Sequence, residues 1–341
     1  MKDLIPKFDY ELVVTGPWTT DFDMYGWMML MGFLVTLSCG LAGNFLIWRR
    51  MALVGDAISH SILPGLVIAF LALAAVVPHD ADGEHSAEFM MRWRTPAMFV
   101  GAVAAALVTV VIIEVIHKWT RVKQDAAIGI SFTSLFAIGV LLINRFASNI
   151  HLDQECVLYG ELEYVPLEPM LSLGGTNIGP LPLVRMALVT VIVIVLLLLF
   201  YKELLVTSFD PNLAYSIGVN PSVVHYGLMM TLAVVIVSAF ESVGAILVIG
   251  MLILPGATAA LISQRLEVCL WLTVLHAALS AVLGIHLSLW LNSNSAAAMV
   301  IVGTALFVMA WAFHGLQKFV LLRRAVRSDA DGPEDSIPNA A

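Results

Sequence analysis

An aspartate and a histidine lie four residues apart in an apolar stretch of the chain. They are Asp56 and His60, within ALVGDAISHSILPG (Ala52–Gly65). In an α-helix this spacing places both side chains on one face. A carboxylate and an imidazole are ligands that manganese, iron and zinc accept. Because an ionisable residue inside a membrane span is costly, it marks a candidate functional site. We therefore expect a partial metal site, completed by another span or by a second copy of the chain.

A second interpretation stays open from the residues alone. Asp56 could be buried against a serine or a helix N-terminus, with His60 as a core histidine beside it. The stretch ends in Pro64-Gly65, and Pro-Gly within a span predicts a broken helix whose freed backbone groups are covered by protein or water. The letters ILPG recur at Ile253–Gly256. Paired interruptions in two halves of a chain point to a transport site, so we expect a second break near Pro255.

The composition predicts a membrane protein. Of the 341 residues, 60% are hydrophobic and 12% are charged, whereas a soluble domain carries about 25% charged residues. We predict an all-α polytopic membrane protein without a substantial soluble domain. The net charge of -8 argues against a nucleic-acid partner. No GxxxxGK[ST] motif is present, so we expect no enzyme activity and no nucleotide hydrolysis by this chain itself. The cysteines are too scattered for a disulfide framework or a zinc knuckle: Cys39, Cys156 and Cys269.

Apolar stretches of about 20 residues predict nine transmembrane helices, within a range of eight to ten. The sixth and seventh share residues 223–262 and are joined near Glu241. We expect an extracytoplasmic N-terminal segment at 1–23, a transmembrane domain at 24–316 and a cytoplasmic tail at 317–341. The predicted spans are 24–48, 53–77, 97–116, 126–145, 183–201, two within 223–262, 266–291 and 296–315.

Basic residues predict the orientation in the plasma (cytoplasmic or inner) membrane, because cytoplasmic connections are enriched in Lys and Arg. Alternate connections, starting after the first span, hold eleven of the seventeen basic residues. The N-terminus is then outside and the C-terminus inside. The opposite side carries acidic loops, which either raise the local cation concentration or are ordinary solvated loops. The eleven residues are Arg49, Arg50, Lys118, Arg121, Lys123, Lys202, Arg265, Lys318, Arg323, Arg324 and Arg327.

Other ionisable residues near the spans are weaker metal candidates. Glu114 and Glu241 lie near span ends, where they can reach polar surroundings. His276 and His286 are ten residues apart, which at about 100° per residue places them on nearly opposite sides of a helix. We keep Glu241 and His286 as secondary candidates and expect core packing for the histidines.

The stretch PGATAALISQRLE (Pro255–Glu267) ends the seventh span on the predicted cytoplasmic side. Small residues followed by charged ones suit a short helix that docks on a partner. They suit an ordinary turn equally well, and the residues alone do not choose between the two.

Five blocks, taken in order, resemble the membrane permease subunits of ATP-binding-cassette importers for zinc, manganese and iron. The resemblance covers Gly26–Gly315. The blocks are MALVGDAISHSILPGLVIAF (Met51–Phe70), RVKQDAAIGISFTSLFAIGVLLI (Arg121–Ile143), LYGEL (Leu158–Leu162), FDPNLAYSIGV (Phe209–Val219) and AFESVGAILVIGMLILPGATAALISQRL (Ala239–Leu266).

The resemblance implies a homodimer, or a pair of permease subunits, bound to a cytoplasmic ATP-binding-cassette ATPase. A metal-binding protein on the outer face would deliver the ion. Asp56 and His60 fall on the family's intramembrane cation-coordinating pair. The cargo would be a divalent transition-metal ion, and ESVG at Glu241–Gly244 leans toward manganese, then iron or zinc. No permanently bound cofactor is expected. The contact with the ATPase would fall on Gly256, Ala257, Thr258, Gln264 and Arg265.

Two stretches depart from the family pattern. Leu287–Val300 lacks a turn of the Pro-Ser-Gly type, and the loop Pro78–Pro96 is longer than we expect. Both concern the outer rim and the docking of a delivery protein. The alternative functions are a permease for a metal chelate, which would tolerate loss of Asp56, and a metal carrier that needs no ATPase, which would need a charged relay through several spans. If Asp56 and His60 bind the metal ion, acidic pH should weaken binding because the ligands must be deprotonated.

Overall fold

The computed structural model describes residues 6, 8–19, 21–76, 84–146, 160, 162–173 and 176–330. In this part the chain is almost entirely helical, with one small β-hairpin. In chain order the elements are η1 (Glu11–Thr15), η2 (Gly16–Trp18), α1 (Phe22–Trp48), α2 (Leu53–Val76), α3 (Glu84–Trp119), α4 (Gln124–Phe146), η3 (Leu162–Leu167), β1 (Met170–Leu173), β2 (Thr176–Pro180), α6 (Leu181–Leu199), α7 (Tyr201–Phe209), α8 (Pro211–Ser216), α9 (Pro221–Val243), α10 (Ala245–Ile262), α11 (Leu266–Leu291) and α12 (Ser295–Ala330).

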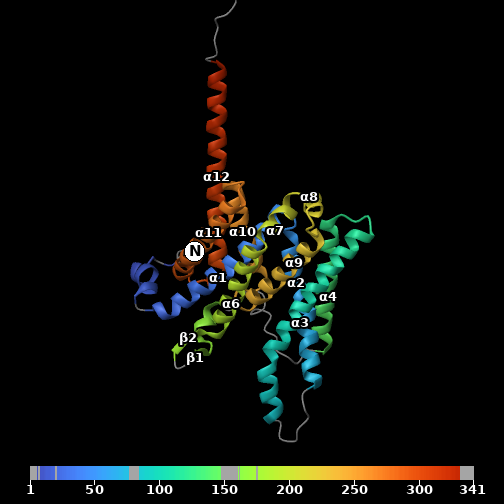
Figure 1. Cartoon of the computed structure of the whole chain (residues 1–341). Coiled ribbons are helices and arrows are strands. Elements are labelled where there is room, and N and C mark those ends of the chain that lie inside the picture. The colour runs from blue at the N-terminus through green and yellow to red at the C-terminus, as the bar shows by residue number, and fades with distance from the viewer. Residues whose placement is uncertain are drawn as a thin grey trace, which may run out of the picture.

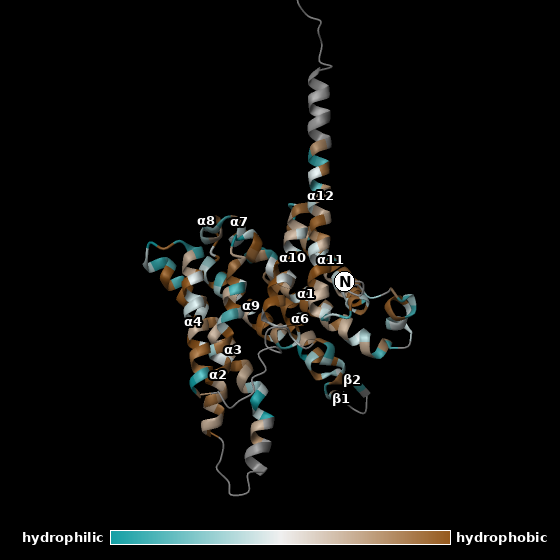
Figure 2. Ribbon diagram, turned by 180° about the vertical axis from the view of Figure 1, so that it is seen from behind, coloured by the Kyte–Doolittle hydropathy of each residue, from teal (hydrophilic) through white to brown (hydrophobic). Residues whose placement is uncertain are grey.

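The predicted spans are confirmed by length and composition. Among the described residues, eight helices are long and apolar enough to cross a membrane, and Ile246–Ile262 is a shorter apolar helix. The sixth and seventh predicted spans are α9 and α10, which separate at Gly244 with a φ of 81°. Only glycine adopts such a φ at low cost. Figure 2 shows hydrophobic residues along the middle of the helices and hydrophilic residues toward their ends.

The helices form two neighbouring groups (Figure 1). Helices α2, α3 and α4 pack together on one side of the molecule, and α1 packs against α6, α10 and α11 on the other. Helix α9 contacts members of both groups, including α1, α2 and α3. Because α1 packs against the helices of its own group and against α9, most of α1 is buried. Its polar side chains therefore need partners inside the bundle. Asn44 has one in Thr273 of α11, whose Oγ1 accepts a hydrogen bond from Asn44 Nδ2 at 2.8 Å.

The predicted helix breaks near Pro64 and Pro255 are wrong. Helix α2 continues through Pro64, and α10 continues through Pro255. Each proline packs against a glycine of a neighbouring helix. A Cβ on Gly139 would lie 3.0 Å from Pro64 Cδ, and one on Gly40 would lie 3.0 Å from Pro255 Cβ. The prolines are tolerated because neighbouring helices cover the helix where the backbone hydrogen bond is lost.

One loop prediction also needs correction. The predicted polar loop Pro78–Pro96 is helical from Glu84, because α3 starts there and includes Pro96. Helix α12 runs on to Ala330, so the predicted domain boundary at 317 falls inside a helix. The acidic connection between α4 and α6 contains η3 and an antiparallel hairpin in which Met170 of β1 lies opposite Pro180 of β2.

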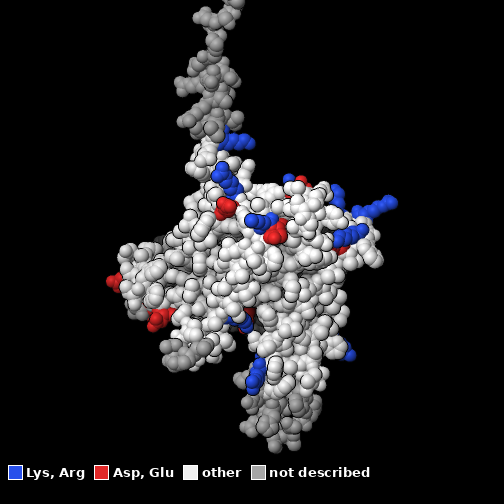
Figure 3. All heavy atoms as spheres, in the orientation of Figure 1, with Lys and Arg blue, Asp and Glu red and all other residues white. Residues whose placement is uncertain are grey.

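One end of the molecule is distinguished by charge and by projecting helices. The short helices α7 and α8 lie at this end, and α12 rises beyond the bundle there. Figure 3 shows that most Lys and Arg side chains on the visible face gather at the same end. Burial raises the pKa of Tyr201 at the start of α7, and the nearby Glu267 at the start of α11 raises it further. The beginnings of α7 and α11 therefore lie at one end of the bundle.

Candidate metal site

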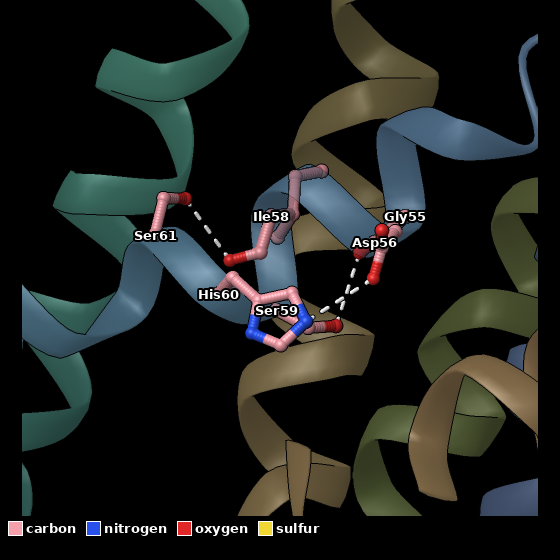
Figure 4. A network of polar contacts seen from close by, with 6 residues as sticks. All are labelled: Gly55, Asp56, Ile58, Ser59, His60 and Ser61. Carbon is pink, nitrogen blue, oxygen red and sulfur yellow. Dashed lines mark hydrogen bonds and ion pairs between the residues drawn. The ribbon is translucent and has the colours of Figure 1, made fainter. Parts of the chain in front are cut away.

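Asp56 and His60 lie side by side on one face of α2, as their spacing predicts. His60 Nε2 is 3.3 Å from Asp56 Oδ1 (Figure 4). Asp56 belongs to the first turn of the helix, where the helix dipole stabilises a negative charge. The two potential ligand atoms therefore already face each other without any rearrangement of α2.

The separation of these two atoms fits one metal ion. Nitrogen and oxygen ligands lie about 2.1 Å from a bound transition metal. Two atoms at that distance and 3.3 Å apart subtend an angle of about 100° at the ion, between the ideal values of about 90° for octahedral and about 109° for tetrahedral coordination. Asp56 Oδ1 and His60 Nε2 could thus occupy adjacent positions of either coordination shell.

Helix α2 is held rigidly from behind this face. Ser61 Oγ accepts a hydrogen bond of 2.6 Å from Thr109 Oγ1 of α3. Gly65 lies so close to α3 that a Cβ on it would overlap the carbonyl oxygen of Gly101. In front, the His60 ring is 5.8 Å from the ring of Phe132 in α4. Packing against α3 and α4 therefore fixes both the helix and the imidazole.

The pair remains open on one side. The side chain of His60 is 29% exposed and that of Asp56 is 33% exposed. No group of three or more His, Cys, Asp or Glu side chains close enough to hold a metal occurs among the residues that the structure describes. One copy of the described chain thus supplies two protein ligands and leaves the rest of the coordination shell accessible.

The secondary candidates lie in other surroundings. Glu241, at the end of α9, forms an ion pair with Arg185 of α6. His286 of α11 uses both ring nitrogens, because Nε2 accepts a hydrogen bond of 3.1 Å from Trp18 Nε1 and Nδ1 lies 2.7 Å from the Val282 carbonyl oxygen. The structure does not bring Glu241 or His286 to the Asp56–His60 pair.

The residues predicted to contact an ATPase divide into two groups. Gly256 and Thr258 are buried in the middle of α10; a Cβ on Gly256 would lie 3.3 Å from the Asn44 Cα of α1. Ala257 is half-buried in the same turn. The other two residues are exposed in the short link between α10 and α11: Gln264 and Arg265.

The short helices α7 and α8 form a further candidate surface that was not predicted from the sequence. Asp210 lies between them, and its Oδ1 accepts hydrogen bonds from the backbone nitrogens of Asn212 and Leu213, which caps α8. Tyr215 in this helix is 75% exposed, although it is aromatic. The Asp210-Pro211 pair was the available signal, since Asp followed by Pro is typical of a helix start.

Comparison with known proteins identifies the family to which this fold belongs. Residues 21–314 match the ABC 3 transport family. The chain is 40% identical over 287 residues to the manganese transport system membrane protein MntD of Bacillus subtilis, covering 84% of this chain and 91% of that protein. It is 36% identical over 310 residues to the zinc transport system membrane protein TroD of Treponema pallidum, covering 89% and 78%.

A solved structure agrees as well. PsaBC from Streptococcus pneumoniae, in complex with Fab, superposes with a TM-score of 0.68 at 28% identity, covering 88% of this chain and 94% of that one. The family match spans all the helices from α1 to most of α12, including the Asp56–His60 pair. The chain therefore belongs to the ABC 3 transport family.

Proposed function

We propose that this chain is the membrane-spanning subunit of an importer for divalent transition-metal ions, driven by ATP hydrolysis on a separate subunit. The observation that carries the proposal is the Asp56–His60 pair, with its two ligand atoms 3.3 Å apart on the open face of an apolar helix. The family supports the same class of cargo, since relatives are named for manganese and zinc transport.

Manganese is the cargo that we favour, followed by iron and zinc. A carboxylate oxygen and an imidazole nitrogen suit all three ions, and neither is a soft sulfur ligand. The described cysteines, Cys39 and Cys269, are buried elsewhere in the bundle. The relative at 40% identity is named for manganese. Two ligands from the chain hold an ion weakly, which suits transport because the ion must also leave.

A second copy of the chain completes the site in this proposal. Asp56 and His60 are open on one side, and the described residues offer no third ligand beside them. A two-fold axis is the commonest symmetry of homo-oligomers. Two copies related by such an axis near this face would bring two such pairs together. The other partners are an ATP-binding-cassette ATPase inside the cell and a metal-binding protein outside it.

The basic end of the molecule is the cytoplasmic end in this proposal. It carries α7, α8, the α10–α11 link and the projecting part of α12, and cytoplasmic surfaces of membrane proteins are enriched in Lys and Arg. Helix α8 and the exposed Gln264 and Arg265 would meet the ATPase there. Gly256 and Thr258 are too deeply buried for direct contact and would act only through the packing of α10 against α1.

Metal uptake by the assembled importer tests the proposal. Vesicles containing the chain with its ATPase and its metal-binding protein would be supplied with manganese, iron or zinc at equal concentration. We expect Asp56→Asn and His60→Gln each to lower uptake of the cargo by at least about tenfold, the loss known for weakened metal ligation. The matched controls Glu241→Gln and His286→Gln change a carboxylate and an imidazole outside the site and should keep most of the uptake.

The outcomes are distinguishable. Loss of manganese uptake, with normal amounts of assembled complex, supports the pair as the ion path. Normal uptake of free metal by both site variants would refute the site. Uptake of a metal chelate that is insensitive to Asp56→Asn would favour the chelate permease instead. Metal uptake by the chain without any ATPase would favour a carrier.

A further inference from the structure

Arg49, at the end of α1, has an unusual environment for a cation. Its guanidinium is half-buried, and burial lowers its pKa. Its hydrogen bonds go to hydroxyl groups: Nε donates to Ser208 Oγ at 3.1 Å, and a terminal nitrogen donates to Thr207 Oγ1 at 2.7 Å. Among the described residues, no carboxylate forms an ion pair with it. The charge of Arg49 is thus held by two hydroxyl groups that both belong to α7.

On one side, the chain connects Arg49 to the Asp56–His60 pair. Arg49 directly follows α1, and the turn there is closed by the hydrogen bonds from Arg50 N to the Ile47 carbonyl and from Met51 N to the Leu46 carbonyl. Arg50 has a φ of 58°, which fixes the direction of the turn. Helix α2 starts at Leu53 and reaches Asp56 within its first turn. The corner between α1 and α2 is therefore short and tightly hydrogen-bonded.

The second side leads to the short helices at the basic end. Thr207 and Ser208 belong to the last turn of α7. The ring of the next residue, Phe209, lies 5.1 Å from the ring of Trp48, which strengthens the same contact. Asp210 then caps α8 directly. Only a few residues separate the Arg49 hydrogen bonds from the exposed surface of α8.

We propose that Arg49 is a positioning residue that transmits movement of α7 and α8 to the Asp56–His60 pair. The inference rests on the proposed function, in which α8 meets the ATPase. When the ATPase moves α8, α7 moves with it, and the hydrogen bonds of Arg49 carry the α1–α2 corner along. Asp56 is then displaced at the start of α2. The planar guanidinium suits this task because Nε and a terminal nitrogen both donate to α7 and so fix its direction relative to the corner.

Simultaneous measurement of manganese uptake and ATP hydrolysis tests this role. The complete importer in vesicles would carry Arg49→Gln, or Thr207→Val together with Ser208→Ala, which removes both acceptors. We expect ATP hydrolysis to continue while the manganese transported per ATP falls about fivefold in each variant, as for other residues that couple distant sites. Combining the substitutions should add little further loss, because both remove the same interaction. Arg50→Gln, the exposed neighbour, should leave the ratio unchanged.

An unchanged amount of manganese per ATP in Arg49→Gln would overturn the proposal. If Arg49→Gln failed to assemble, the hydroxyl variant would decide, and a normal ratio in that variant would overturn the proposal too. Equal effects of Arg49→Gln and Arg50→Gln would also overturn it, since they would reflect loss of charge at this surface. A wild-type complex that hydrolyses ATP but takes up no metal would refute the proposed function itself, whereas the coupling ratio tests Arg49 alone.

Discussion

At the scale of single residues, Gly160 shows how closely the connection between α4 and α6 approaches the helix bundle. It has a φ of +72°, and a Cβ on it would overlap the carbonyl carbon of Val243, where α9 ends. Just after it, Leu162 and Val165 of η3 are buried, and Glu163 Oε1 accepts a hydrogen bond of 3.0 Å from the backbone nitrogen of Ser295 at the start of α12. Gly160 thus lets η3 join the ends of α9 and α12.

Replacing Gly160 by alanine should destabilise the protein strongly. The left-handed backbone costs about 1–2 kcal/mol for alanine, and the overlap with Val243 adds about 1–3 kcal/mol. Gly218→Ala is the matched control, because Gly218 has a φ of +88° but open space around it, so it bears the backbone cost alone. Thermal unfolding of the purified variants would rank them, and equal unfolding temperatures would show that the close approach at Gly160 does not hold.

The sequence predicted that Asp56 and His60 lie side by side, because this depends only on local helix geometry. Asp56 and His60 share a helix, so their spacing alone places them together. The contacts of Glu241 and His286 are made with residues distant in the sequence, Arg185 and Trp18. Their contacts arise from tertiary packing, which hydrophobic periodicity does not encode. For the same reason, nothing in the sequence around Arg49 indicated its two hydroxyl partners, about 160 residues away in the chain.

At the scale of elements, the spans were predictable and their irregularities were not. Long apolar stretches give α1 to α4 and α6 directly, and Gly244 divides α9 from α10 close to the predicted joint at Glu241. Prolines were misleading, because a proline breaks a helix only where nothing covers the freed backbone. At Pro64 and Pro255 neighbouring helices lie close enough to do so. The repeated ILPG letters therefore mark two sites of close helix packing.

Helix α8 should be reachable from the cytoplasm when no ATPase is bound, and bound ATPase should cover it. Tyr215 is 75% exposed, so a cysteine there would react with a thiol reagent that cannot cross membranes. Cys39 and Cys269 are buried, and Cys156→Ser removes the remaining native thiol. In this background, Tyr215→Cys should react only from the cytoplasmic side, and bound ATPase should slow the reaction.

Tyr164→Cys is the matched control for that labelling. Tyr164 is 58% exposed in η3, on the side predicted to be outside, and it should react only from there, with or without ATPase. Reaction of Tyr215→Cys from outside would reverse the proposed orientation. Equal reaction rates with and without ATPase would remove α8 from the proposed contact.

At the scale of the whole molecule, the Asp56–His60 pair is a partly exposed position in an otherwise packed bundle. The back of α2 is closed against α3, whereas the face with Asp56 and His60 is partly open. Helix α4 beside it exposes large apolar side chains, Phe136, Leu141 and Phe146 among them. Lipid would suit these apolar residues but not the carboxylate, since burying an unpaired charge in hydrocarbon is costly. A second copy of the chain suits both.

Mixed pairs of subunits would reveal whether two copies hold one ion. Copies with different C-terminal tags allow complexes with one wild-type chain and one Asp56→Asn, His60→Gln chain to be purified by both tags in turn. If each copy had an independent site, the mixed complex would keep about half of the wild-type uptake, because independent contributions add. If both pairs bind the same ion, uptake should fall far below half, close to that of the doubly substituted complex. Exchanging the tags must leave the result unchanged. Half-maximal uptake in both tag arrangements would mean that each chain completes its site alone, from waters or from residues outside the described part.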